Sequence, residues 1–420
     1  MTSQPSCSDE DPIVQRLKFN DPTLTFLLIG PATCTRQDAL SIGEIARLDL
    51  FELILLFLRS GVTKGSFVSA LAFHGIFEPC FCEDWPGEGF CEALASNAVI
   101  SCLVVFACRL GFEQGKNFGR SLATNSTLQT LVVRWFMASG WELGLTAGLA
   151  GNSALTCVSI QDSSIHGGKW FGEVLAVNST LTCLDLSCNS IWSDGAARIG
   201  EGLAVNSTLV TLNLGKNRIG EGAVRIGEAL AVNSTLTELN LIANQLTGTV
   251  GEKIGEGLAA NHALLTLDLS YNPIGDAAGV MIGEALALNS TLTKLDISFN
   301  RIEDDGGAMI GEALASNSSL TALQLGSNLI GENGVGRIGD GLAFNSTLTS
   351  LDLSQNTIGK NGGARIDEGM ASNCSLTRLN VRGASFGGQK LNDWLDRNQH
   401  NVRRKSISLF EILLPLLSYF

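Results

Sequence analysis

The residues that could do chemistry in this 420-residue chain do not gather into a catalytic motif. The Gly-Lys pairs that begin at Gly115, Gly215 and Gly359 lack both a following Ser or Thr and the GxxxxGK spacing of a phosphate-binding loop. The four histidines are too scattered to indicate a pair of nucleophile and base; they are His74, His166, His262 and His400. We therefore expect a protein that is not an enzyme and needs no cofactor.

Cysteine is the next residue type that could bind a ligand. Cys80, Cys82 and Cys91 lie near His74, but their spacing contains no CxxC pair and a second pair of ligands is missing, so we expect no metal site. The chain has eleven cysteines, which is an odd number, and no cysteine pairs cap the two ends of the repeating segment described below. We expect reduced thiols and a cytoplasmic protein.

A polar stripe carries the strongest binding hypothesis. One position reads Asp185, Asn213, Asn240, Asp268, Asp296, Gln324 and Asp352, spaced 27 or 28 residues apart. Tyr271 and Phe299 lie beside it, and Glu238, Lys294 and Arg378 lie two residues before it. Aromatic anchors among polar groups are typical of protein interfaces. We predict that a partner protein binds Asp185, Glu238, Asp268, Tyr271, Lys294, Asp296, Phe299, Asp352 and Arg378. The alternative is that Asp and Asn are simply the ordinary residues of this strand position.

The stripe belongs to a segment that recurs from Leu181 to Ala384. LTCLDLSCNSI returns with conservative changes, and its asparagine falls at Asn189, Asn217, Asn244, Asn272, Asn300, Asn328 and Asn356. A fixed period of this size is the signature of a solenoid, in which each repeat packs only on its neighbours. The alternation of leucines predicts a short strand whose equivalents stack in parallel, with the stripe on the outward face. We expect the seven asparagines to point inward and form a structural ladder that satisfies backbone groups.

The remainder of each segment predicts a return helix. Ala196, Ile199, Gly200 and Leu203 have the spacing of one helical face, and the regular inward glycines suggest close packing of helix on sheet. The acidic residue that follows each such glycine, from Glu201 to Asp340, should point outward. Helices are wider than strands, so the stack should curve into a horseshoe with the parallel β-sheet on its concave face and the helices on its convex face.

Asn-x-Ser/Thr sequences also recur; their asparagines are Asn125, Asn178, Asn206, Asn233, Asn289, Asn317, Asn345 and Asn373. Each closes a helix just before a strand. We expect these asparagines to adopt the left-handed conformation of a helix-ending turn, without glycosylation.

The repeats, for example IGDAAGVMIGEALALNSTLTKLDISFN, resemble the ribonuclease-inhibitor-like class of leucine-rich repeats. That class occurs in ribonuclease inhibitor, in the repeat domains of NOD-like receptors and in Ran GTPase-activating proteins. The resemblance is strong over residues 178–383, fair over 87–177 and weak before. It implies an α/β solenoid and a non-catalytic scaffold that binds a protein. The alternatives are a GTPase-activating protein similar to the Ran activators, or a cytosolic immune sensor or regulator. No nucleotide-binding domain and no long acidic tail accompany the repeats. These differences argue against a complete NOD-like receptor and weaken the interpretation as a Ran activator.

These patterns predict four parts: a disordered lead at 1–20, a cap of degenerate repeats at 21–86, the array at 87–390, and a cap with an apolar tail at 391–420.

The net charge of -13 disfavours nucleic acid as a partner. Apolar stretches at 41–59 and near the C-terminus carry charges or Pro415, so we expect no integral membrane span. The tail would more readily cover the last repeat than touch a membrane peripherally. We expect a monomer.

Overall fold

In the computed structural model the described residues are 26–29, 87–106, 111–134, 140–163, 165–382 and 396–399. The predicted lead at 1–20, most of the predicted cap at 21–86 with its Cys80 and Cys82, and the tail from 400 lie outside them. The chain divides into two compact units. The first holds the chain up to Ile191 together with Val205–Asn213, and the second holds Trp192–Ala204 and the chain from Leu214 onward.

The first unit alternates strands and helices. Its elements are β1 (Phe26–Ile29), α5 (Gly87–Ser96), β2 (Cys102–Phe106), α6 (Phe112–Thr124), β3 (Thr130–Arg134), α7 (Trp141–Gly151), β4 (Cys157–Gln161), α8 (Lys169–Val177), β5 (Cys183–Asp185) and β6 (Thr211–Asn213). The strands pair in parallel and in sequence order, so that Thr130 lies beside Cys157 and Cys157 beside Cys183.

The second unit continues the same alternation. Its elements are α9 (Trp192–Val205, whose last residue belongs to the first unit), the 3-10 helix η1 (Gly220–Ala223), α10 (Val224–Leu230), β7 (Glu238–Asn240), α11 (Gly248–Ala260), β8 (Thr266–Asp268), α12 (Gly275–Leu288), β9 (Lys294–Asp296), α13 (Asp304–Ser316), β10 (Ala322–Gln324), α14 (Glu332–Phe344), β11 (Ser350–Asp352), α15 (Gly359–Ser372) and β12 (Arg378–Asn380). Strands β7 to β12 are again parallel and in sequence order.

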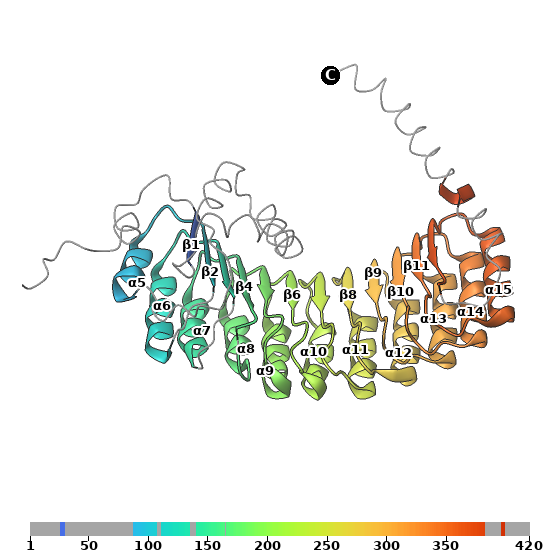
Figure 1. The fold of residues 1–420 in the computed structure, drawn as a ribbon, viewed down its shortest axis with the longest axis horizontal. Helices are drawn as coiled ribbons and strands as arrows, with labels where there is room; N and C mark the ends of the chain where they lie inside the picture. The colour runs from blue at the N-terminus through green and yellow to red at the C-terminus, as the bar shows by residue number, and fades with distance from the viewer. Residues whose placement is uncertain are drawn as a thin grey trace, which may run out of the picture. The chain divides into compact units, whose positions relative to one another are not determined.

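Within each unit the helices lie on one side of the parallel strands (Figure 1). The leucines of the repeat fill the layer between them: Leu267, Leu269 and Leu292 are all buried, as are their equivalents in neighbouring repeats. The helical face predicted from Ala196, Ile199, Gly200 and Leu203 is buried on α9. The predicted α/β solenoid is therefore confirmed, and its interior is the apolar stripe of each strand and helix.

The asparagines that follow the strands are buried and hydrogen-bonded along the array. Asn272 is representative, since its Nδ2 donates to the carbonyl oxygens of Leu241, Leu269 and Ser270 at 2.8 to 3.1 Å. Its Oδ1 accepts the backbone N–H groups of Asn244 and Leu246 in the preceding repeat. One side chain thus meets backbone groups that the strand leaves unpaired at its end.

The asparagines of the Asn-x-Ser/Thr sequences make a second ladder at the opposite end of the strands. Asn289 Nδ2 donates to the carbonyl oxygens of Leu258 and Asn261 in the preceding repeat, at 2.9 and 2.8 Å. Its Oδ1 accepts the N–H groups of Thr291 and Leu292. Asn261, which has no Ser or Thr two residues later, makes the same contacts. The amide, and not the glycosylation sequence, is what the repeat uses.

The left-handed conformation expected at these helix ends is wrong. Asn289 has φ -76° and ψ 130°, and the other asparagines that cap helices are equally extended. An extended backbone lets the carboxamide reach both its own following N–H groups and the neighbouring repeat. Asparagine is therefore held here by side-chain hydrogen bonds and not by its tolerance of positive φ.

The inward glycines of the helices also differ from the expectation. A Cβ at Gly311 would lie 2.5 Å from the backbone carbonyl carbon of Arg337 on the next helix, and Gly283 and Gly339 face their next helices in the same way. These glycines allow neighbouring helices to approach each other, whereas we had expected them to allow helix and sheet to approach. Any side chain at Gly311 would push α13 and α14 apart.

Candidate functional site

The outward face of strands β7 to β11 collects the predicted stripe into one row. Parallel pairing places Asn240 beside Asp268, Asp268 beside Asp296, and Asp296 beside Gln324. All are partly exposed. Because neighbouring strands lie about 4.8 Å apart, each side chain in the row has the next one as its closest equivalent.

Each acidic side chain in this row closes a turn at the end of its strand. Asp268 Oδ1 accepts the backbone N–H and the hydroxyl of Ser270 at 2.9 and 2.7 Å, and Asp296 Oδ1 accepts the same pair from Ser298. Asn240 Oδ1 accepts the N–H of Ile242 in the same way. The turn thus needs an oxygen at this position but does not need a negative charge.

The second carboxylate oxygen separates these aspartates into two groups. Oδ2 of Asp185 accepts a hydrogen bond from Gln161, and Oδ2 of Asp352 accepts one from Asn380. Oδ2 of Asp268 and of Asp296 has no hydrogen-bond partner in the described part of the chain. Two adjacent strands therefore carry two carboxylate oxygens that are open to a donor from outside.

Burial disfavours the ionised form of Asp296. Partial burial raises the pKa of Asp296, hydrogen bonds from Ser298 oppose that rise, and the negative charges of Asp268 and Asp352 add to it. Removing a carboxylate from water disfavours its ionised form. Ionising Asp296 is therefore less favourable in the folded protein than in water.

Tyr271 and Phe299 stack on each other three residues after these aspartates. Their ring centroids are 4.0 Å apart with an angle of 12° between the planes. They remain 54% and 45% exposed. Offset aromatic stacking contributes about 1 kcal/mol beyond burial, so the pair forms a firm apolar projection at the end of β8 and β9.

Both aromatic residues have a left-handed backbone, with φ 58° and 56°. The equivalent residues in the other repeats of this region share it, including Ala243, Ser327 and Gln355. The repeat therefore imposes this conformation on whatever residue stands there, at roughly 1 to 2 kcal/mol for a residue other than glycine. No glycine occupies the position in these repeats, and in two of them a large aromatic side chain does.

The remaining predicted binding residues are spread more widely. Glu238 lies on β7 and Lys294 on β9, with Thr266 of β8 between them. Asp352 and Arg378 lie on β11 and β12. Asp185 belongs to the first unit, where Gln161 bridges its carboxylate to the side chain of Arg134. The structure brings Asp268, Asp296, Tyr271 and Phe299 together, while the other five are not part of that cluster.

Leu329 is a surface residue that sequence reasoning missed. It is 57% exposed and follows Asn328, in the repeat after Phe299. Its N–H donates to the carbonyl oxygen of Ile302 at 2.8 Å, which holds the turn of one repeat against the next. The sequence could have indicated it, because a leucine stands here where the other repeats have a polar residue or proline, namely Arg301, Pro273 and Thr357.

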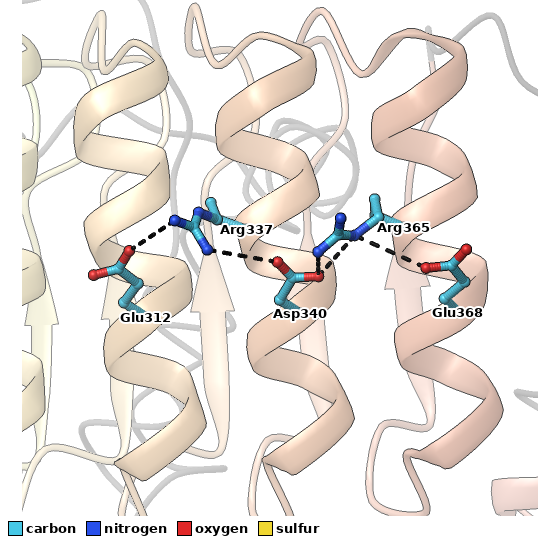
Figure 2. Close-up of polar contacts among 5 residues, drawn as sticks. All are labelled: Glu312, Arg337, Asp340, Arg365 and Glu368. Carbon is cyan, nitrogen blue, oxygen red and sulfur yellow. Dashed lines mark hydrogen bonds and ion pairs between the residues drawn. The ribbon is translucent and has the colours of Figure 1, made fainter.

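The helical surface is organised differently. Its acidic row pairs with basic residues three positions earlier, as in Arg198–Glu201, Arg225–Glu228 and Lys253–Glu256. Figure 2 shows how the pairing extends across α13, α14 and α15, where Arg337 bridges Glu312 to Asp340 and Arg365 bridges Asp340 to Glu368. We expected this acidic row to point outward and to stay solvated. Much of it is exposed but neutralised by its own neighbours, which leaves it little capacity to attract a charged partner.

No helix among the described residues is long and apolar enough to cross a membrane. These residues contain no group of three or more His, Cys, Asp or Glu side chains placed to hold a metal ion.

Comparison with protein families identifies the recurring segment. The family model for the leucine-rich repeat matches residues 177–200, 205–225, 260–283, 288–311 and 344–366. No curated protein sequence matches the chain significantly. The matched segments include the strands and helices that carry the aromatic pair.

Solved structures with a similar arrangement were also found. Actin-binding site 2 of leiomodin-1 is 23% identical, with 37% of this chain and 94% of that chain covered and a TM-score of 0.35. The C-terminal domain of tropomodulin from Caenorhabditis elegans is 16% identical, with 38% and 98% covered and a TM-score of 0.34. TLR13, in its complex with ssRNA13, is 17% identical, with 72% and 42% covered and a TM-score of 0.43.

Proposed function

We propose that this chain, which is a leucine-rich repeat protein, is a non-catalytic scaffold that binds a partner protein on the outward face of its strands. Leucine-rich repeats generally serve protein interaction, which is the broad function that the family match supports. The finer proposal is the place of binding: strands β8 and β9, around Tyr271, Phe299, Asp268 and Asp296.

The exposed aromatic stack is the observation that carries this proposal. Two large rings stand in adjacent repeats, in a backbone conformation that disfavours them, and roughly half of each ring surface is left to solvent. Burying that surface against a partner would recover the hydrophobic free energy that folding leaves unused. Aromatic residues surrounded by polar groups are the residues that dominate binding energy in protein interfaces.

A photo-crosslinker tests the location of binding directly. We would place p-benzoylphenylalanine at Leu329, which is exposed in the repeat that follows Phe299, and identify the captured protein by mass spectrometry. The matched control carries the same group at Phe344, which is also exposed but lies at the end of α14. We expect the specific partner to be captured from position 329 and not from position 344.

The captured partner then allows affinity to be measured. Tyr271→Ala with Phe299→Ala should weaken binding about 30-fold or more, since truncating interface aromatics costs about 2 kcal/mol or more. Glu256→Ala with Glu284→Ala, on the helical surface, should change it less than about threefold. Circular dichroism would confirm that both double variants are folded. The reverse ranking would move the binding site to the helices.

We also propose that the protein acts in the cytoplasm. Cys102 and Cys374 are free thiols, which fits a reducing compartment. The side-chain nitrogens of Asn206 and Asn289 are engaged in the second ladder, where a glycan could not be accommodated. Intact mass of protein from its native cells should show no N-glycan; a mass shift removed by an N-glycosidase would contradict the cytoplasmic location.

A further inference from the structure

We propose, resting on the function proposed above, that Tyr271, Phe299, Asp268 and Asp296 form a site for an arginine side chain of the partner protein. The guanidinium would lie flat against an outer ring face of the aromatic stack, donate a hydrogen bond to the open oxygen of the nearer aspartate and be attracted by the charge of the other.

The orientation of the aromatic stack provides a flat surface for the guanidinium. Tyr271 and Phe299 occupy equivalent positions in neighbouring repeats and stack nearly parallel, so the stacking direction runs from one repeat to the next. Their outer faces therefore turn toward the equivalent residues on either side, Ala243 and Ser327. Both side chains are small, so neither places another ring against the outer face of the stack. A guanidinium is flat, and it stacks favourably on aromatic faces.

The two open oxygens supply the polar half of the site. Asp268 and Asp296 are directly paired across β8 and β9, and each uses only Oδ1 for hydrogen bonds to the described residues. Asp185 and Asp352 stand at the same strand position, but their second oxygens are already occupied by Gln161 and Asn380. Among the aspartates of the row, the pair with free acceptors is the pair beside the aromatic stack.

The carboxylates are not required by the fold at this position. Asn240 closes the same turn with a neutral amide. Burial and the two neighbouring carboxylates raise the pKa of Asp296 and so disfavour its charged form. A cation from outside would relieve both effects at once. Charge complementarity thus favours a basic group, in agreement with the net charge of -13.

Arginine fits this arrangement better than lysine does. Its guanidinium is planar, carries five donors in a fixed fork and loses hydration more readily than an ammonium. It can therefore stack on a ring and donate to the nearer carboxylate at the same time, whereas an ammonium can pair with a carboxylate without stacking on the ring.

The experiment uses fluorine NMR of the full-length chain. Tyr271 and Tyr419 are its two tyrosines, so the Tyr419→Phe protein labelled with 3-fluorotyrosine reports on Tyr271 alone. The probes are three acetylated and amidated pentapeptides, Gly-Gly-X-Gly-Gly, in which X is arginine, lysine or citrulline. Citrulline has nearly the shape of arginine but no charge.

We expect the arginine peptide to shift the Tyr271 signal saturably, with a Kd of about 1 to 10 mM, as befits one side chain. The lysine peptide should bind at least about threefold more weakly and the citrulline peptide at least about tenfold more weakly. Asp268→Asn with Asp296→Asn should weaken the arginine peptide about tenfold, while Asp185→Asn with Asp352→Asn should leave its affinity within about twofold.

Equal shifts from the arginine and citrulline peptides, or no shift from the arginine peptide up to about 20 mM, would overturn the arginine site. An unchanged affinity in the Asp268→Asn, Asp296→Asn variant would overturn it as well. The proposed function fails separately, if the crosslinked partner still binds the Tyr271→Ala, Phe299→Ala variant normally. Loss of partner binding in that variant, with no arginine preference, would leave the binding surface in place and remove only its assigned ligand chemistry.

Discussion

The outward strand faces of the two units share one repeat geometry but differ in exposure and chemistry. On β2 to β4 of the first unit, Val104, Val132 and Ser159 occupy the stripe position and are at most 4% exposed. On β7 to β9 of the second unit, the same position holds Asn240, Asp268 and Asp296, which are partly exposed. The position in the strand therefore determines neither the polarity nor the accessibility of the residue that stands there, and both differ between the two units.

The interiors of the two units do not differ in this way. Asn125 in the first unit and Asn289 in the second make the same four kinds of hydrogen bond to their own and the preceding repeat. Inward positions must fit the next copy of the repeat, whereas outward positions are free to vary. A surface that can vary without disturbing the stack is where a repeat protein can acquire a binding site.

The largest expected effect comes from placing a charge on the buried strand face. Val132→Asp should cost about 3 kcal/mol or more, because it buries an unpaired carboxylate. Asn240→Asp occupies the same repeat position on the exposed face and should cost less than about 1 kcal/mol. Urea unfolding of the two variants measures both. Similar losses in the two variants would show that the two faces do not differ in accessibility.

The shared interior predicts equal effects in the two units. Asn125→Ala and Asn289→Ala should each cost about 1 to 3 kcal/mol, because each leaves buried backbone N–H and C=O groups without a partner. Asn272→Ala in the first ladder should fall in the same range. Thermal and urea unfolding would measure all three. If either Asn125→Ala or Asn289→Ala had no measurable effect, the second ladder would not be a common element of the interior.

The thiol of Cys102 tests the same comparison at high pH. Burial raises the pKa of Cys102 on β2 to about 12 from 9.0. The folded state therefore holds this proton where the unfolded state releases it, so stability from Cys102 is complete below pH 9.0 and is lost as the pH rises from 9.0 to about 12. Cys102→Ala should lose less stability than the parent protein across that interval.

The same cysteine should resist alkylation. At pH 8, iodoacetamide should modify the exposed Cys374 at least about 100-fold faster than Cys102, because only an accessible thiolate reacts. Peptide mapping by mass spectrometry locates the modified residue. Comparable rates at the two cysteines would show that the outward face of β2 is open to solvent.

The smallest effect should appear on the exposed face. Burial raises the pKa of Asp296, so the folded protein disfavours its carboxylate, and the resulting loss of stability is absent below its unfolded pKa of 3.8 and develops as the pH rises through the folded value. Asp296→Asn should therefore raise the Tm slightly at pH 7, with a gain that disappears at low pH. A lower Tm at pH 7 would mean that the carboxylate stabilises the fold and needs no binding role.

Much of the fold could be predicted because the period and the inward residues are written in the sequence. Leucines at alternating positions can only face the core of a stacked strand, and Asn272 and its equivalents recur where a strand must end. The row from Asp185 to Asp352 and the neighbourhood of Tyr271 and Phe299 also follow directly from the register of identical repeats.

The tertiary structure decided the contacts between repeats, which spacing does not specify. The sequence placed Gly311 on an inward helical face, but only the packing showed that it faces Arg337 on the next helix. The helix-ending asparagines suggested a local turn, yet Asn289 is held by carbonyl oxygens 28 and 31 residues earlier. Which aspartate oxygens are occupied depends in the same way on residues from neighbouring repeats, such as Gln161 and Asn380. The sequence by itself determined what faces inward, because inward residues repeat. Only the three-dimensional arrangement determined which outward groups remain available, because their partners come from other repeats.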